Sequence, residues 1–211
     1  MPSRFLRRDP SQARSRALVD AVLGAFDAML THDDRDVTIE RLVERAGVGI
    51  GSFYEYFTNK DSLVGALVER ATRDNFAALL ARFDAAASLD LDAATRALAT
   101  AVVETYLRYP RRTRVLLGGI GRLGLMPIVF AEQQRFATEL AGRALRYVPA
   151  TPIVELEAAM GQVVDAAIGV LVAELYRSPR PLDEVSLAIT RQSLAILEYV
   201  RPRSARTARE R

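Results

Sequence analysis

The stretch Thr38–Lys60, TIERLVERAGVGIGSFYEYFTNK, predicts two short helices joined by a tight turn. Thr38 is a favourable N-cap, and four apolar residues follow it at helical spacing. Gly47 can adopt the left-handed conformation that ends a helix. Residues 49–57 then predict a second helix, which carries two phenylalanines on one side. A helix, a glycine-containing turn and a second helix form the helix-turn-helix arrangement, whose second helix enters the major groove of DNA.

The end of this stretch continues into an ordered set of residues that is typical of one family. Residues 46–63, AGVGIGSFYEYFTNKDSL, resemble the end of the DNA-binding motif of the tetracycline-repressor (TetR) family of bacterial regulators. The resemblance covers roughly residues 12–71, about a quarter of the chain. Gly49 departs from the family pattern because Ser or Thr usually caps the recognition helix there, and Tyr56 stands where His is frequent. The matching positions are Ala46, Gly47, Val48, Gly51, Phe53, Tyr54, Tyr56, Phe57, Lys60, Asp61 and Leu63.

The resemblance implies an all-α protein with three features. These are an N-terminal DNA-binding module, a helical ligand-binding domain, and a homodimer formed by the last two helices. The function that it implies is that of a sequence-specific transcriptional regulator, a repressor that a small-molecule effector releases from its operator on double-stranded DNA.

Apolar periodicity independently predicts helices throughout, because no segment alternates in the manner of a strand. A first helix, from Ser11 to about Leu30, has an apolar stripe that closes a three-helix module with the helix-turn-helix pair. Further helices are predicted at 61–85, 92–109, 111–117, 125–148, 153–176 and 182–200, about nine in all. The predicted organisation is a disordered arm at 1–10, a DNA-binding domain at 11–72 with its helix-turn-helix motif at 38–57, a ligand-binding and dimerisation domain at 73–200, and a basic disordered tail at 201–211.

The last two predicted helices are the most hydrophobic. Residues 153–176 are apolar nearly all the way round, and residues 182–200 are apolar over more than half of the helix circumference. This is more apolar surface than one helical domain can cover, so we expect a symmetric pair of chains to bury it. The dimer would present two recognition helices, about 34–36 Å apart or somewhat more, to a near-palindromic site.

Composition narrows the classes of function. The 211-residue chain has no cysteine and a single histidine, His32. The lack of cysteine excludes disulfides, thiolate metal sites and cysteine nucleophiles. The single histidine argues against a His-based zinc site and against a Ser-His-Asp triad. We predict no catalytic residue, no metal and no cofactor. No apolar run approaches the ~18 residues of a membrane span, and the basic start MPSRFLRRDP has no apolar stretch after it, so we expect a soluble cytoplasmic protein without a membrane partner.

Charge supports DNA binding only locally. The net charge is +3, but residues 1–70 carry ten basic and eleven acidic residues, a net charge of −1. The segment through Arg16 has five arginines against one acid, which favours either phosphate or minor-groove contact by the arm or a solvated tail. Lys60 is the only lysine of the chain and occupies the lysine position of the family motif.

The candidate DNA-contacting residues lie in and beside the recognition helix. Tyr54 either belongs to the core or bonds a phosphate, and the motif position favours phosphate. The Ile50 side chain can make an apolar contact with a thymine methyl group, and the Ser52 hydroxyl can form a hydrogen bond with a base. Glu55 either accepts from cytosine or only repels phosphate. The full predicted set is Thr38, Gly49, Ile50, Gly51, Ser52, Tyr54, Glu55, Tyr56 and Lys60.

A candidate effector site centres on Asp165, in the middle of the most apolar helix. A buried carboxylate needs a partner or must be protonated. One reading pairs it with an arginine from the preceding helices, namely Arg114, Arg122 or Arg135. In the other interpretation, a mostly apolar pocket is lined by Tyr106, Phe130, Gln162 and Asp165. Such a pocket suits a cationic or hydrogen-bond-donating ligand.

Residues 118–124, GGIGRLG, contain a literal GxGxxG at Gly119, Gly121 and Gly124. A dinucleotide site needs a strand before this motif and a βαβ unit around it, and neither is visible in the sequence. The glycines are better interpreted as a hinge between helices.

Two alternatives to the released repressor remain. One is an all-α enzyme or cofactor-binding bundle, although the chain lacks cysteine, lacks histidine ligands and has no Glu-x-x-His pair. The other is a ligand-independent DNA-binding protein. An induction assay would distinguish it, because no effector would release such a protein from DNA.

Overall fold

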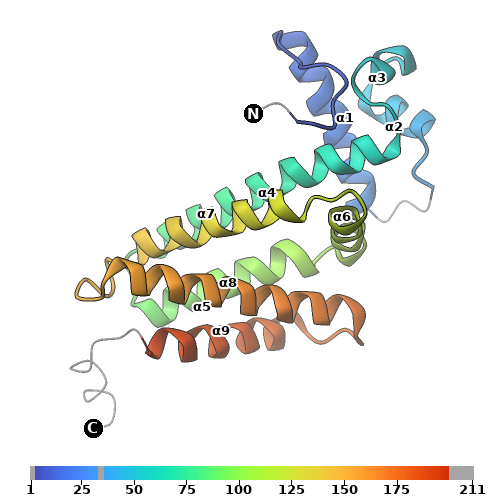
Figure 1. Ribbon diagram of the computed structural model, residues 1–211. Helices are drawn as coiled ribbons and strands as arrows, with labels where there is room; N and C mark the ends of the chain where they lie inside the picture. The colour runs from blue at the N-terminus through green and yellow to red at the C-terminus, as the bar shows by residue number, and fades with distance from the viewer. Residues whose placement is uncertain (1–2, 33–35, 200–211) are drawn as a thin grey trace. The chain divides into compact units, whose positions relative to one another are not determined.

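The computed structural model describes residues 3–32 and 36–199. The described part is all-helical, as predicted, with nine helices and no strand (Figure 1). The predicted tail at 201–211 lies outside the described residues. The helices are α1 Ala13–Thr31, α2 Ile39–Ala46, α3 Ile50–Tyr56, α4 Lys60–Ala85, α5 Leu91–Leu107, α6 Pro110–Arg122, α7 Met126–Ala144, α8 Ile153–Tyr176 and α9 Leu182–Glu198.

The chain divides into two compact units whose boundaries fall inside α4, between α5 and α6, and inside α7. Unit 1 comprises Met1–Arg73 and Tyr109–Val129, and unit 2 comprises Asp74–Arg108 and Phe130–Arg211. Unit 1 therefore contains α6, whereas the sequence predicted a DNA-binding domain that ends at residue 72. The physical reason is a set of contacts that α6 makes within unit 1, which residue spacing along the chain does not reveal.

Local sequence signals determine the helix ends of unit 1. The Thr38 hydroxyl accepts a hydrogen bond from the backbone N–H of Arg41 at 3.3 Å, and this caps α2. Gly47 ends α2 with φ = 66°, in the left-handed region that only glycine adopts without strain. The backbone N–H of Val48 then reaches back to the Val43 carbonyl at 3.0 Å, as in a Schellman motif.

The core of unit 1 forms where α1, α2, α3 and the first part of α4 meet. Phe26 of α1, Phe53 of α3 and Phe57 after α3 are fully buried, and the rings of Phe53 and Phe57 stack at 5.2 Å between centroids. The predicted apolar stripe of α1 supplies Val22, Leu23, Met29 and Leu30 to the same core. The stripe therefore closes the three-helix module as the periodicity indicated.

Helix α6 is longer than predicted, because the glycine-rich segment is helical rather than a hinge. The helix continues through Gly118, Gly119 and Gly121 to Arg122, and only Gly124, with φ = 63°, lies in the left-handed region and turns the chain. A side chain at Gly119 would place its Cβ 2.6 Å from Val64 of α4. Gly119 thus allows α6 and α4 to approach closely. No strand precedes the GxGxxG pattern in the described residues.

Ion pairs also hold α6 in unit 1. The Arg112 guanidinium donates two hydrogen bonds to the Asp27 carboxylate of α1, the longer of them 3.2 Å. Arg122 pairs with Asp61 in the first turn of α4, and this hydrogen bond raises the pKa of Arg122. A bidentate arginine–carboxylate pair fixes orientation as well as distance.

In unit 2, α9 packs against α5 and α8. The core contains Leu98 of α5, Phe136 and Leu140 of α7, and Leu156 and Met160 of α8. The hydroxyls of Thr100 and Ser186 lie 2.9 Å apart and join α5 to α9. The buried Glu174 carboxylate accepts hydrogen bonds from Arg180, which close the connection between α8 and α9 and raise the pKa of Arg180.

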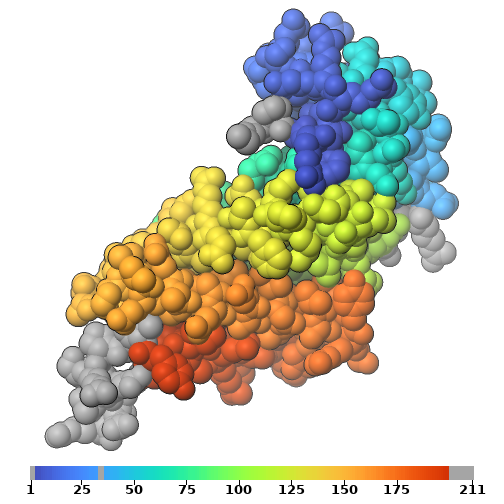
Figure 2. Space-filling model, in the orientation of Figure 1, coloured from blue at the N-terminus to red at the C-terminus, as the bar shows by residue number. Residues whose placement is uncertain are grey.

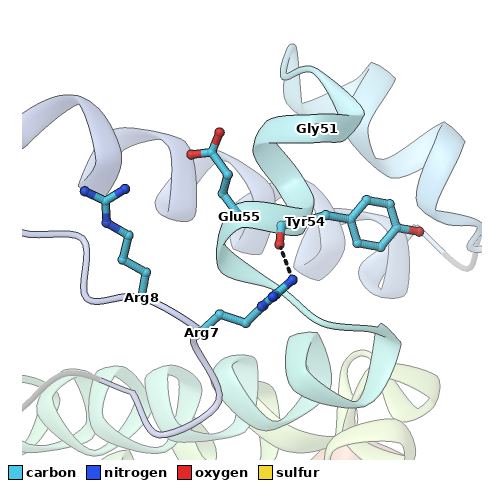
Figure 3. A pocket seen from close by; sticks show the side chains of 5 residues that line it. All are labelled: Arg7, Arg8, Gly51, Tyr54 and Glu55. Atoms are coloured by element: carbon cyan, nitrogen blue, oxygen red, sulfur yellow. Dashed lines mark hydrogen bonds between the residues drawn. The ribbon is translucent and has the colours of Figure 1, made fainter.

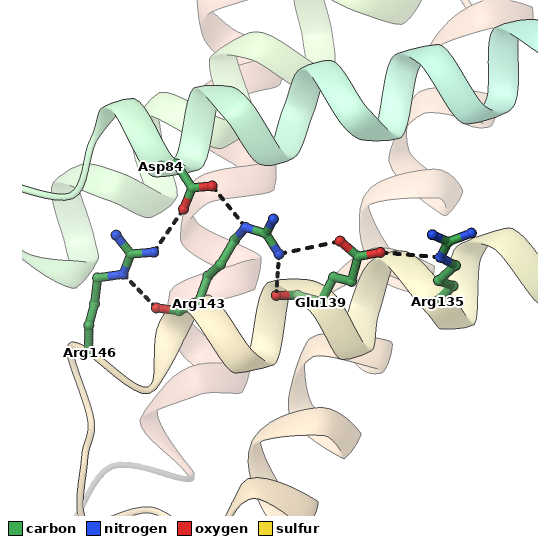
Figure 4. A network of polar contacts seen from close by, with 5 residues as sticks. All are labelled: Asp84, Arg135, Glu139, Arg143 and Arg146. Carbon is green, nitrogen blue, oxygen red and sulfur yellow. Dashed lines mark hydrogen bonds and ion pairs between the residues drawn. The ribbon is translucent and has the colours of Figure 1, made fainter.

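A surface network joins the end of α4 to α7 within unit 2 (Figure 4). The Asp84 carboxylate accepts from Arg143 at 2.9 Å and from Arg146 at 2.8 Å. The hydrogen bond from Arg143 is the main cause that lowers the pKa of Asp84, against the partial burial that raises it. Glu139 extends the network by pairing with Arg135 and Arg143, both one helical turn away.

Helix α8 is long and apolar enough to cross a membrane by length and composition alone, which corrects the expectation that no segment approaches a span. The same composition is found in core and interface helices of globular proteins, so it is weak evidence for a membrane. Less than a third of its most apolar window is buried within the single chain. In Figure 2, α8 (orange) lies at the surface of unit 2 in this view, and α9 (red) lies beside it.

Candidate nucleic-acid interface

Helix α3 divides its side chains between a buried and an exposed face. Phe53 is fully buried, whereas the side chains of Ile50 and Tyr54 are 46% and 41% exposed. Glu55 and the two glycines at 49 and 51 are also exposed, and Ser52 is half-buried. The helix is therefore anchored by one aromatic face and offers its N-terminal half and its opposite face to a ligand.

Tyr56 does not belong to the exposed set, although it is among the predicted DNA contacts. Its side chain is only 6% exposed and packs in the core of unit 1. The reason is helical geometry: Tyr56 follows Phe53 by three residues and so shares its inward face.

Two further predicted residues lie on the turns that flank the helix pair. The Lys60 ammonium group is exposed and donates to the Val37 carbonyl at 3.1 Å, which ties the start of α4 to the segment before α2. An ammonium group has three donors, so this bond leaves donors for an anion. The Thr38 hydroxyl accepts from the Arg41 backbone N–H and keeps its own proton to donate.

A shallow depression beside α3 brings the N-terminal segment next to the recognition helix (Figure 3). One guanidinium nitrogen of Arg7 donates to the Tyr54 carbonyl at 3.1 Å, and the backbone N–H of Arg7 donates to the Tyr56 carbonyl at 3.0 Å. The residues that line the depression are Arg7, Arg8, Gly51, Tyr54 and Glu55. Two of these, Arg7 and Arg8, are absent from the predicted residue set.

The N-terminal segment is not the free arm that we predicted, as far as residues 3–10 are concerned. Phe5 and Leu6 pack against the core of unit 1, and Arg4 pairs with the buried Glu69 of α4. The apolar pair Phe5-Leu6 inside an otherwise basic segment was the signal in the sequence that could have revealed this packing.

The four predicted effector residues do not form a buried pocket. Gln162 and Asp165 are exposed on α8, and Phe130 is 52% exposed, whereas Tyr106 of α5 is half-buried. Asp165 is exposed, so the premise that its carboxylate is buried and therefore needs a partner is wrong. Two of the arginines considered for it pair elsewhere, Arg122 with Asp61 and Arg135 with Glu139.

Gln133 of α7 was missed by the sequence analysis. Its Oε1 atom is buried and has no hydrogen-bond partner in the described part of the chain. An unpaired buried acceptor is costly, so such atoms often mark a place where water or a ligand binds. The same part of the chain contains no group of three or more His, Cys, Asp or Glu side chains that could hold a metal ion.

Comparison with known proteins finds a family model for the helix-turn-helix module and solved structures that share the fold. The family model of bacterial regulatory proteins of the tetR family matches residues 25–67, which span the end of α1, α2, α3 and the start of α4. The chain is also similar to the crystal structure of a TetR-family transcriptional regulator from Mesorhizobium loti MAFF303099, at 13% identity and a TM-score of 0.66, with 87% of this chain and 95% of that chain covered.

Two other solved structures have the same fold. A TetR transcriptional regulator from Rhodococcus sp. RHA1 aligns at 20% identity and a TM-score of 0.61, over 87% of this chain and 97% of that one. A transcriptional regulator from Streptomyces coelicolor A3(2) aligns at 18% identity and a TM-score of 0.51, over 83% and 98% of the two chains. No curated protein sequence matches the chain.

Proposed function

We propose that this chain is a member of the TetR family of bacterial transcriptional regulators. In this proposal it is a cytoplasmic repressor that reads a near-palindromic operator as a homodimer and leaves it when a small molecule binds. The observation that carries the DNA-binding part is the exposed face of α3. Ile50, Tyr54 and Glu55 project from a short helix whose other face is locked into the core by Phe53.

The exposed residues divide into those that read bases and those that position the protein. Ile50 offers an apolar contact to a thymine methyl group, and Glu55 can accept from the amino group of cytosine. Ser52, which is half-buried, can still donate from its hydroxyl. Tyr54, Thr38 and Lys60 carry donors suited to phosphate. The two glycines at 49 and 51 present no side chain, so the DNA backbone can approach α3 closely.

The DNA-binding proposal is tested by selecting operator sequences from a random duplex pool with the intact protein and then measuring variants on the selected DNA. We expect Lys60→Ala to weaken binding to all sequences and to reduce the slope of log K against log salt by about 0.9, because phosphate contacts carry no sequence information. We expect Ile50→Ala or Ser52→Ala to change which bases are preferred. An unchanged affinity and salt slope for Lys60→Ala would exclude this residue from the phosphate contacts.

The homodimer proposal is supported by the outward face of α8. The exposed residues Ala158, Gln162, Asp165 and Gly169 follow one another at helical spacing, and the small ones among them allow close approach of another helix. The exposed side chains of Leu187 in α9 and of Tyr199, directly after α9, add apolar area. We therefore assign Gln162 and Asp165 to subunit pairing rather than to an effector pocket.

The effector proposal now centres on Gln133 instead of Asp165. The buried, unpaired Oε1 atom of Gln133 accepts hydrogen bonds, and its neighbour on α7 in the next turn, Phe136, stacks on Phe76 with 4.7 Å between ring centroids. This surrounding suits a mostly apolar ligand that carries one hydrogen-bond donor. We expect such ligands to raise the melting temperature of the protein. Gln133→Ala should abolish this rise, whereas Gln134→Ala, exposed on the same helix, should not.

A further inference from the structure

The N-terminal segment contacts the recognition helix at its carboxyl end. Arg7 donates to two carbonyls there, from its side chain to Tyr54 at 3.1 Å and from its backbone to Tyr56 at 3.0 Å (Figure 3). The last carbonyls of a helix have no partner within it, and a cation at that end opposes the negative pole of the helix dipole. Arg7 therefore serves as a C-terminal cap of α3.

Phe5 anchors the same segment against α4. A Cβ atom added to Gly65 would lie 2.5 Å from the Phe5 ring, so the ring occupies the space that any other residue at 65 would need. Gly65 is itself buried. The contact requires glycine at this position for packing and not for backbone conformation.

Arg4 provides a third attachment, at the turn after α6. Its guanidinium donates to the carbonyls of Leu123 and Gly124 at 3.4 and 3.2 Å. It also lies 3.9 Å from the carboxylate of Glu69, which is 7% exposed on α4. A buried carboxylate is costly without a counter-charge, so this pairing holds Arg4 in place.

From these three attachments we propose that residues 4–7 form a strap that positions the recognition helix and ties it to the turn between α6 and α7. Arg7 is its positioning residue. The strap is all within unit 1. Its effect on operator affinity rests on the proposed function, whereas its effect on the order of α3 does not.

Helix α3 needs such support for two reasons. It has seven residues, and helices shorter than roughly 12–15 residues are marginal in water without tertiary contacts. Its N-cap is Gly49, which makes no side-chain capping bond. The strap stabilises the opposite, carboxyl end of this short helix through Arg7, and it does so without contacting DNA.

The test compares hydrogen exchange of the α3 amides in the full-length protein, without DNA, for variants of the three attachments. Arg7→Ala, Phe5→Ala and Gly65→Leu should each make α3 exchange about five- to tenfold faster, because a charged hydrogen bond or the anchor that positions it is lost. Arg4→Ala should act in the same direction, although Arg4 does not touch α3. The controls are Arg8→Ala and Gly24→Leu, the latter adding bulk to an α1 glycine that has open space around it.

Operator binding then separates a strap from a phosphate-binding arm. On DNA selected by the unmodified protein, Phe5→Ala and Gly65→Leu should weaken binding about fivefold with the same salt slope, since neither changes charge. If Arg7 instead contacted a phosphate, Arg7→Ala would lower the slope by about 0.9 and leave α3 exchange unchanged, and the proposal would be wrong.

Other outcomes are equally decisive. Unchanged α3 exchange in Phe5→Ala overturns the strap. Because Phe5→Ala adds no bulk to the core, it still provides this test if Gly65→Leu fails to fold. Faster exchange in Arg7→Ala without any change in Arg4→Ala overturns the tie to the α6–α7 turn. If no DNA is enriched in the selection, the proposed function fails while the exchange result still decides the strap.

Discussion

Tyr54 and Tyr56 are two residues apart on α3 and have opposite environments. Tyr54 is 41% exposed and makes an edge contact with Phe53 at 5.2 Å between ring centroids, whereas Tyr56 is buried. Both positions match the family motif, so sequence alone assigned both to DNA. The distinction follows from the three-residue offset between Tyr56 and Phe53, which places both rings on the core side.

We therefore expect Tyr56→Ala and Tyr54→Ala to differ in their effect on stability. Removal of the buried Tyr56 ring should lower the free energy of unfolding by about 3–5 kcal/mol. Removal of Tyr54 should cost about 1 kcal/mol, from its edge contact, while it weakens DNA binding. Urea denaturation followed by circular dichroism measures both values. Equal losses of stability would mean that Tyr54 is a core residue.

The Asp84 carboxylate gives a pH-dependent contribution to stability. Hydrogen bonds from Arg143 and then Arg146 lower its pKa in the folded chain below the ordinary value of 3.8. A lowered pKa in the folded state means that the contribution is present above the ordinary value and is lost as the pH falls through the lower one. Because the network is partly exposed, its size should be no more than about 1 kcal/mol.

Asp84→Asn should therefore destabilise the protein slightly at pH 7, and the difference from the unmodified chain should shrink below pH 3.8. Urea midpoints at pH 7 and pH 3 provide the measurement. Asp74→Asn, at an exposed carboxylate earlier on the same helix, is the control. A difference that grew at low pH would contradict the assigned sign.

At the scale of elements, α6 shows how one glycine decides which helices pack together. Gly119 is buried against Val64 of α4, while its neighbour Gly118 is exposed and has no atom within 4 Å of the space that a Cβ would fill. Both are helical. The glycine-rich segment thus combines a residue required for close packing with one that only weakens the helix.

The two glycines should respond in opposite directions to alanine. Gly119→Ala forces Val64 to shift and should destabilise by about 1–3 kcal/mol. Gly118→Ala should stabilise by roughly 0.5–1 kcal/mol, because alanine loses less backbone entropy in a helix. Thermal melting distinguishes the two. Destabilisation by both variants would show that the segment needs flexibility and not close packing.

At the scale of the whole molecule, the proposed homodimer rests on the outward face of α8. By length and composition the helix could cross a membrane, yet less than a third of its most apolar window is buried in the single chain. In an aqueous protein, an apolar helix that its own chain leaves partly uncovered indicates a protein–protein contact. A symmetric pair of α8 and α9 hairpins would cover it.

Light scattering at micromolar concentration should therefore return the mass of two 23.3 kDa chains. Gly169→Arg on α8 or Leu187→Arg on α9 should produce the single chain, because a buried unpaired charge is costly. Ala78→Arg, on the exposed side of α4, should leave the dimer intact. A monomer in the unmodified protein, or dissociation by all three variants, would contradict an α8–α9 interface.

What the sequence determined by itself is local or periodic. The cap at Thr38, the left-handed Gly47 and the apolar stripe of α1 predicted the helix-turn-helix and the all-α class, because each depends on residues within a few turns of one another. The family motif, which lies within residues 46–63, was recognisable for the same reason.

What only the tertiary structure decided depends on residues far apart in the chain. Phe5 meets Gly65, Arg4 meets the α6–α7 turn, and Arg112 meets Asp27, across about 60 to 120 residues of sequence. These contacts convert a predicted free arm into a strap and add α6 to unit 1. The position of Asp165 was likewise undecidable from an almost uniformly apolar helix, since only the packing of α9 and α5 determines which side of α8 remains exposed.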